Sequence, residues 1–306
     1  RGGRDPLFGM MRALDVLESG IRGREWPEWR FDPGHNACPG CGATLAAKIV
    51  LTEIGDNAIY FVPASCASLY FDPLGTAAVR APVIHTVFAA AFAEAEGMAY
   101  GLKIRGRKEK VVVWAGDGAS YDIGFGGLSG VAARGADILV ICNDNEGYQN
   151  TGGHESTATP PDARKKGSTI EVPRMRKKGI IGILEAHDVP YLATASIAFP
   201  EDMRMKLRKA ISISGFRFIL LLNPCVTWGY ESKYTVKLAR LSVETGYFPL
   251  YEIEGGVLRI THEPEMRPLE DFTSLQSRFK GVNLERMKEE IRERWERILS
   301  KASRSS

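Results

Sequence analysis

Four of the five cysteines in this 306-residue chain are spaced so that their sulfurs could together bind metal. Cys38 and Cys41 form a C-x-x-C pair, whereas Cys66 and Cys225 are single and distant in the sequence. A lone C-x-x-C pair is typical of a zinc knuckle, a redox dithiol or half of a cluster site. Because zinc sites usually bring a second such pair, the two single cysteines favour a buried 4Fe–4S cluster. Zinc binding and unligated thiols stay open as alternatives.

A carboxylate and an amide follow two successive segments that are predicted to be buried strands. Asp117 stands between Gly116 and Gly118 directly after VVVWA, and Asn145 follows ILVICN. Magnesium prefers oxygen ligands in octahedral geometry, and glycine lets the backbone approach a phosphate closely. The helix expected after Gly118 would present free N–H groups to the same anion. We therefore expect Asp117, Asn145 and the Gly147 carbonyl to hold magnesium and a diphosphate.

The whole string WAGDGASYDIG…ICNDNEGYQNTGG is typical of a thiamine-diphosphate motif, and it lies between the cysteines in the sequence. Together the two features indicate that carbon is oxidised at a thiazolium ring and that electrons leave through a nearby cluster. Thiamine also requires a glutamate that protonates its aminopyrimidine ring, usually from a facing domain. No segment of this chain looks like that domain, so a partner is expected to complete the active site.

Composition limits the remaining choices. The chain is 44% hydrophobic and 25% charged, with a net charge of +3, which is ordinary for a globular protein and gives no indication of nucleic-acid binding. No apolar stretch reaches the roughly 18 to 20 residues that span a bilayer, and no signal-peptide layout is present. Five cysteines do not form a disulfide framework at this length, so we expect a cytoplasmic, reducing compartment. Cys142, inside ILVICN, is interpreted as a small buried hydrophobe.

Alternating segments predict an α/β fold with a doubly wound, mostly parallel sheet of the thiamine-diphosphate-binding type. Buried strands are expected at 58–63, 111–115, 138–143, 189–195 and 218–223. Helices are expected at 43–54, 85–102, 126–134, 201–212 and 233–245. The predicted divisions are an N-terminal arm (1–35), a thiamine and cluster domain (36–230), and a C-terminal extension (231–306). The extension should hold a hairpin (250–253 and 257–260) and a charged helix that Asn283 caps. Basic runs at 164–166 and 174–178 are interpreted as solvated surface, or as contacts to an anionic partner or cofactor.

The chain resembles the β subunit of 2-oxoacid:ferredoxin oxidoreductases, and within them the pyruvate branch. The resemblance extends from about Gly34 to Phe279. It rests on the following strings: GHNACPGCG, PVIHTVFAAA, GDGASYDIGFGG, NDNEGYQNTGGHESTATP, the Cys225 segment and LSVETGYFPLYEIEGG.

The resemblance implies cofactors and residue roles. One 4Fe–4S cluster would be ligated by Cys38, Cys41, Cys66 and Cys225. Magnesium would be bound by Asp117, Asn145 and Gly147, and thiamine diphosphate would contact Gly116, Gly118 and Ala119. Asn150 and Thr151 would lie near the thiazolium and the substrate as catalytic residues. His85, at the start of a packed helix, is expected either near the cofactor or as a hydrogen-bonding residue of the core.

The resemblance also implies a reaction and partners. The expected activity is oxidative decarboxylation of pyruvate or a similarly small 2-oxoacid, with electrons passing through the cluster to ferredoxin. Subunits of α and γ/δ type would supply the activating glutamate and further clusters. Use of coenzyme A is left open.

Three departures from the pyruvate pattern keep other functions in view. The family usually has Thr-Gly-Cys at 64–66, Cys-Pro-Thr-Gly-Trp at 225–229 and glutamine at 154, where this chain has ASC, CVTWG and His154. Oxalate oxidation without coenzyme A is therefore one alternative. A non-redox thiamine-dependent carboxy-lyase with structural cysteines is another. A zinc-stabilised interaction subunit without catalytic activity is the third.

Overall fold

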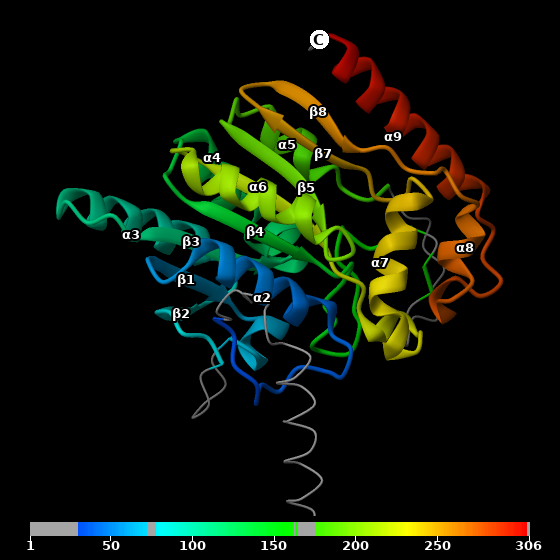
Figure 1. The fold of residues 1–306 in the computed structure, drawn as a ribbon, viewed down its shortest axis with the longest axis horizontal. Coiled ribbons are helices and arrows are strands. Elements are labelled where there is room, and N and C mark those ends of the chain that lie inside the picture. Colours follow the sequence, from blue (N-terminus) through cyan, green and yellow to red (C-terminus); the bar gives the residue numbers. More distant parts are fainter. Residues whose placement is uncertain (1–29, 72–77, 162, 165–175, 305–306) are drawn as a thin grey trace, which may run out of the picture.

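The centre of the molecule is an eight-stranded sheet (Figure 1). The computed structural model describes residues 30–71, 78–161, 163–164 and 176–304. The strand order is β2-β1-β3-β4-β6-β5-β7-β8, and the first six positions pair in parallel. Strand β7 pairs antiparallel with β5 and with β8. The strands are β1 (Ala58–Pro63), β2 (Val83–Thr86), β3 (Lys110–Gly116), β4 (Leu139–Asp144), β5 (Tyr191–Ser196), β6 (Arg217–Leu222), β7 (Leu250–Glu254) and β8 (Val257–His262).

Helices cover both faces of the sheet, as the alternation of segments predicts. On one face α2 (Gly42–Ile54) and α6 (Pro200–Ser212) pack against each other and against the strands. The other face is covered by α3 (Ala91–Ile104), α4 (Phe125–Ala133), α5 (Ile180–Glu185) and α9 (Glu285–Arg304). The remaining helices are α7 (Thr235–Glu244) and α8 (Leu269–Thr273). The fold is thus the expected α/β arrangement with a mostly parallel sheet.

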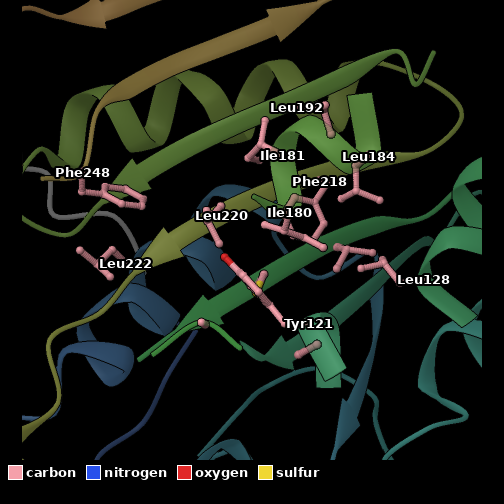
Figure 2. Packing of buried hydrophobic residues seen from close by; sticks show 14 of the residues in the cluster. Tyr121, Leu128, Ile180, Ile181, Leu184, Leu192, Phe218, Leu220, Leu222 and Phe248 are labelled. Carbon is pink, nitrogen blue, oxygen red and sulfur yellow. The ribbon is translucent and has the colours of Figure 1, made fainter. Parts of the chain in front are cut away.

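Strand β3 shows why the central strands are continuous apolar runs. Val111, Val113 and Ala115 join the hydrophobic cluster under α3 and α4, whereas Val112 and Trp114 join the cluster under α2 and α6. Because successive side chains point to opposite faces, a strand covered on both sides needs apolar residues throughout. Figure 2 shows the first of these clusters, where Phe218 and Leu220 of β6 lie beside residues of α5.

The structure confirms the five predicted strands to within two residues and changes two other expectations. The helix predicted at 85–102 is wrong at its beginning, since Val83–Thr86 form strand β2 and the helix begins at Ala91. Three of those four residues are β-branched and favour a strand, and His85 pairs with Val62 of β1. The hairpin predicted at 250–253 and 257–260 is present, and it continues the main sheet. Most of the predicted N-terminal arm, residues 1–29, lies outside the described residues.

The sheet order brings the predicted site segments together. Strands β1, β3, β4 and β6 are consecutive in the sheet, and their carboxyl ends lead to Cys66, Asp117, Asn145 and Cys225. Ligands of parallel α/β sheets bind at the carboxyl ends of the strands. No helix among the described residues combines the length and apolar character that crossing a membrane requires.

Candidate active site

All four predicted cluster cysteines line one cavity of about 120 Å³, which we call the cysteine cavity. Cys38 and Cys41 immediately precede α2, Cys66 begins a short helical turn after β1, and Cys225 follows β6. None of them forms a disulfide. The cavity is several times larger than the roughly 30 Å³ share of one water molecule. The fold therefore gathers four free thiols, distant in sequence, around a space for a group larger than one ion.

The thiols of the cysteine cavity influence one another. Burial, and to a smaller extent the charges of the other three cysteines and Asp117, together raise the pKa of the Cys66 thiol to about 12. Burial also raises the pKa of Cys41, although backbone N–H groups of Thr44 and Ala43 oppose the effect. At Cys225 burial raises the pKa, while the hydroxyl and N–H of Thr227 lower it.

The spacing of these sulfurs does not suit a single ion. No three His, Cys, Asp or Glu side chains among the described residues are close enough to bind one metal ion. Zinc needs all its sulfurs at about 2.3 Å from one point. In a 4Fe–4S cluster each thiolate binds a different iron, so its sulfurs lie farther apart. A zinc ion and a cluster would therefore require different separations of the four sulfurs.

A second cavity of about 130 Å³, which we call the Asp117 cavity, lies at the ends of β3 and β4. One terminal atom of the Asn145 amide lies 3.0 Å from Asp117 Oδ1 and 2.8 Å from the Gly147 carbonyl oxygen. If that atom is nitrogen, it donates a hydrogen bond to each. If it is oxygen, three oxygens face one another and require a cation between them. Neighbouring ligands of magnesium, at 2.0–2.1 Å from the ion, are about 2.9 Å apart, so the spacing suits magnesium.

Asp117 is almost completely buried, with 1% of its surface exposed. Burial and the nearby Asp144 carboxylate raise the pKa of Asp117 well above its ordinary value. Its Oδ2 accepts a hydrogen bond from Ser156 Oγ. The segment 156–159 also binds both sides of the cavity, because Thr157 Oγ1 donates to Asp122 at 2.6 Å and Thr159 Oγ1 donates to the Glu146 carbonyl at 2.8 Å. The hydroxyls of this segment thereby join the end of β3 to the loop after β4.

Tyr148 is a site residue that the sequence did not reveal. A Cβ atom added to Gly118 would lie 2.3 Å from Tyr148 Cε1, so only glycine leaves room for this ring. Gly118 also begins a π-helical turn, Gly118–Ile123, and such turns are frequent at functional sites. Tyr148 OH donates to Asp122 at 3.2 Å, and its ring lines the Asp117 cavity. The Gly-Asp-Gly string was the only sequence signal for this contact.

A buried ionic network supports the loop that carries Asn145 and Gly147. Lys177 Nζ lies 2.8 Å from Asp144 Oδ2 and 3.0 Å from Glu146 Oε1. Arg278 Nη1 lies 2.8 Å from Glu146 Oε2. The basic run at 174–178 was interpreted as solvated surface or as a contact to an anionic partner or cofactor, and for Lys177 this is wrong. Residues 165–175 lie outside the described part of the chain.

The remaining predicted residues are placed as follows. Asn150 is exposed and lines both cavities, and Thr151 is exposed and lines the Asp117 cavity. Gly116, Gly118 and Ala119 line the Asp117 cavity. His85 is exposed on β2 and lines neither cavity, so its contact with a cofactor stays a prediction.

A larger cavity, of about 430 Å³, lies between α5, β7, β8 and α9. Several of its cations are already paired, including Arg176 with Glu293 and Lys301 with Glu185. None of the predicted ligands lines it. The carboxylate, amide and thiols that the sequence singled out line the two smaller cavities instead.

Comparison with known proteins identifies the fold and the family. Residues 66–221 match the family model for the C-terminal TPP-binding domain of thiamine pyrophosphate enzymes. Among solved structures, a 2-oxoglutarate:ferredoxin oxidoreductase from Magnetococcus marinus aligns with a TM-score of 0.57 and 19% identity. That alignment covers 72% of this chain and 81% of the other. It supports the fold alone.

Curated relatives are similar over nearly their whole length. Pyruvate synthase subunit PorB of Methanocaldococcus jannaschii is 41% identical over 86% of this chain and 94% of its own. Ketoisovalerate oxidoreductase subunit VorB of Pyrococcus horikoshii is 41% identical over 89% of this chain and 93% of its own. Pyruvate synthase subunit PorB of Methanothermobacter marburgensis is 43% identical over 87% of this chain and 95% of its own. The chain therefore belongs to the thiamine-pyrophosphate-binding β subunits of 2-oxoacid:ferredoxin oxidoreductases.

Proposed function

We propose that this subunit passes electrons from a small 2-oxoacid, decarboxylated at thiamine diphosphate, into a 4Fe–4S cluster held by Cys38, Cys41, Cys66 and Cys225. The observation that carries the proposal is that the two cavities share lining residues, which form a common wall. Cys66, Asn145, Gln149 and Asn150 line both the cysteine cavity and the Asp117 cavity. A cluster ligand therefore belongs to the same wall as the residues proposed for magnesium and diphosphate, which suits one-electron transfer between neighbouring cofactors.

Thiamine diphosphate, when bound, supplies a carbon nucleophile for the 2-oxo carbon and an electron sink for the decarboxylation. The chain's own residues bind and orient it. Asp117, Asn145 and the Gly147 carbonyl would hold magnesium, as their spacing allows. The backbone of Gly118 and Ala119 would face the diphosphate at the start of a helical turn. Asn150 and Thr151, which are exposed and line the Asp117 cavity, would contact the substrate.

A partner subunit is needed to complete this site. No glutamate is among the described residues that line the Asp117 cavity, although thiamine activation requires one. The names of the relatives describe subunits of larger enzymes. We infer that α and γ/δ-type subunits supply the activating glutamate, and that ferredoxin accepts the electrons.

Two substrates have similar support from the relatives, since the pyruvate synthase subunits named above are 41% and 43% identical to this chain and the ketoisovalerate oxidoreductase subunit is 41% identical. One argument for oxalate is that a histidine near the site, His154, would suit a dianion. The His154 side chain is exposed, and His154 lines a cavity next to Thr227 and Arg278 but not the Asp117 cavity. Pyruvate and ketoisovalerate are therefore the favoured substrates.

Viologen reduction by the anaerobically purified complex tests the activity. Pyruvate, ketoisovalerate, 2-oxoglutarate and oxalate are each offered with and without coenzyme A. Coenzyme-A-dependent reduction with pyruvate or ketoisovalerate is expected. Reduction by oxalate alone would select the alternative substrate. No reduction by any of them, in a complex with intact iron and thiamine, would refute the redox function and leave a carboxy-lyase.

Two variants test the cofactor ligands. Asp117→Ala is expected to lower magnesium and thiamine affinity by more than about 100-fold and to abolish activity, because a first ligand matters more than a supporting residue. Asp56→Ala, on the surface, is its control. Cys66→Ser is expected to lose the cluster signal while the fold is retained, whereas Cys142→Ala should keep its iron. Unchanged iron content in Cys66→Ser would exclude Cys66 as a ligand.

A further inference from the structure

The hydroxyl of Thr227 lies between two hydrogen-bond acceptors. Thr227 Oγ1 is 3.0 Å from Cys225 Sγ and 2.5 Å from Gln149 Oε1. Thr227 belongs to the short helical turn Val226–Trp228 that directly follows Cys225. The turn therefore places one hydroxyl against the sulfur of a proposed cluster ligand and against an amide from the loop after β4.

The orientation of the Gln149 amide follows from its other contact. Gln149 Nε2 donates to the Asn145 carbonyl oxygen at 3.0 Å, and Trp228 Nε1 donates to the same oxygen at 2.9 Å. Reversing the amide would place two oxygens against each other, so Oε1 faces Thr227. An amide oxygen can only accept, and the hydroxyl has a single hydrogen. Gln149 Oε1 and Cys225 Sγ therefore compete for the hydrogen of Thr227.

We propose that Thr227 raises the reduction potential of the cluster by donating its hydroxyl hydrogen to Cys225 Sγ, and that Gln149 opposes this by accepting the same hydrogen. The inference rests on the proposed cluster. Reduction adds negative charge to the cluster and its sulfurs, so a donor to sulfur stabilises the reduced form more than the oxidised form. A hydrogen turned to Gln149 gives the sulfur no such stabilisation.

The position of Gln149 extends this competition to the other cavity. Gln149 lines both the cysteine cavity and the Asp117 cavity. A bound group that draws the Gln149 amide away from Thr227 would release the hydrogen to Cys225 Sγ.

Redox titration of the anaerobically purified complex, followed by electron paramagnetic resonance, tests the inference. Thr227→Val removes the donor and keeps the shape of the side chain, whereas Thr227→Ser keeps the donor. At the midpoint potential of the unaltered complex, Thr227→Val is expected to lower the ratio of reduced to oxidised cluster severalfold. A tenfold fall corresponds to 59 mV for one electron. Thr227→Ser should stay close to the unaltered complex.

Gln149→Met provides the opposite change, because it removes the competing acceptor at similar side-chain length. Its midpoint potential should move to more positive values. Combined with Thr227→Val, it should add no positive shift, since no hydrogen remains to be released. An independent positive shift in the double variant would refute the competition.

Other outcomes separate this inference from the proposed function. If the unaltered complex contains no cluster signal, the proposed function fails first. If the cluster is present and Thr227→Val titrates like the unaltered complex, the role of Thr227 is refuted. Loss of iron from Thr227→Val, with the fold retained, would also overturn it, because the hydroxyl would then hold the ligand in place and not adjust its potential.

Discussion

Two lysines in this chain make the same pair of contacts in different surroundings, and they predict how burial changes an ion pair. Lys177 Nζ lies 2.8 and 3.0 Å from Asp144 and Glu146, whose side chains are fully buried. Lys288 Nζ lies 2.8 and 3.1 Å from Glu270 and Glu285, whose side chains are 52% and 76% exposed. The distances match, so only the environment differs.

The expected loss of stability in each variant follows from the local dielectric constant around the ion pair. At 2.8 Å, two unit charges attract by about 6 kcal/mol at an effective dielectric constant of 20, and by about 1.5 kcal/mol in water. Breaking a buried pair by removing one partner costs about 3–5 kcal/mol, because the other charge is left uncompensated. An exposed pair contributes below about 1 kcal/mol. We therefore expect Lys177→Met to lower the free energy of unfolding by about 3–5 kcal/mol, and Lys288→Met to lower it far less.

Urea denaturation of both variants, followed by circular dichroism, measures the difference. Methionine has a similar length to lysine, so the packing of the side-chain stem changes little. Lys177→Met should also weaken magnesium binding, because Asp144 and Glu146 flank Asn145 in the loop that carries it. Equal losses of stability in the two variants would contradict the reasoning, since burial would then have no effect on the pair.

Two further predictions concern packing and pH. Gly118→Ala would place Cβ 2.3 Å from Tyr148 Cε1, and moving the tyrosine ring to relieve this overlap costs about 1–3 kcal/mol. If that cost is taken from binding, the affinity for thiamine diphosphate should fall about 5- to 150-fold, as measured by calorimetric titration. Gly126→Ala, with open space around it, should bind normally. Burial raises the pKa of Glu252, but the hydrogen bonds from Lys209 and Tyr191 and the charges of Lys209 and Lys206 together outweigh burial and leave the pKa below its ordinary value of about 4.3. Its stabilising contribution is complete above that pH and is lost as the pH falls further, so Glu252→Gln should flatten the decline of stability between about pH 5 and 3.

The sequence predicted most of the sheet because its central strands are unusual in composition. Segments such as VVVWA and ILVIC are buried on both faces, so every residue is apolar and no helical periodicity competes. Strand β2 was missed for the opposite reason. It is only four residues long and half exposed, and it precedes an alanine-rich stretch that suggested a longer helix. Its pairing with β1, which decides its structure, involves residues far away in the sequence.

The site could be predicted where a strand end determines the position of a residue. Asp117 and Asn145 follow β3 and β4, which are neighbours in the sheet, so their convergence needed only the strand assignment. The supporting contacts could not be found in this way. Lys177 reaches Asp144 and Glu146 from a basic run that looked like solvated surface, and Arg278 reaches Glu146 from much later in the chain. Such partners depend on tertiary packing, for which a single sequence has no local signal.

The charges of the buried network give an independent reason to place a cation at Asp117. Three carboxylates, Asp117, Asp144 and Glu146, are at most 1% exposed. Among the described residues, the cations in contact with them are Lys177 and Arg278, and both contact the Asp144–Glu146 side. Asp117 accepts a hydrogen bond from the neutral hydroxyl of Ser156, and within the described part of the chain it forms no ion pair of its own. Because a buried charge without compensation is strongly unfavourable, Asp117 needs either a proton or a cation. Under the proposed function, magnesium between Asp117, Asn145 and the Gly147 carbonyl would supply that charge.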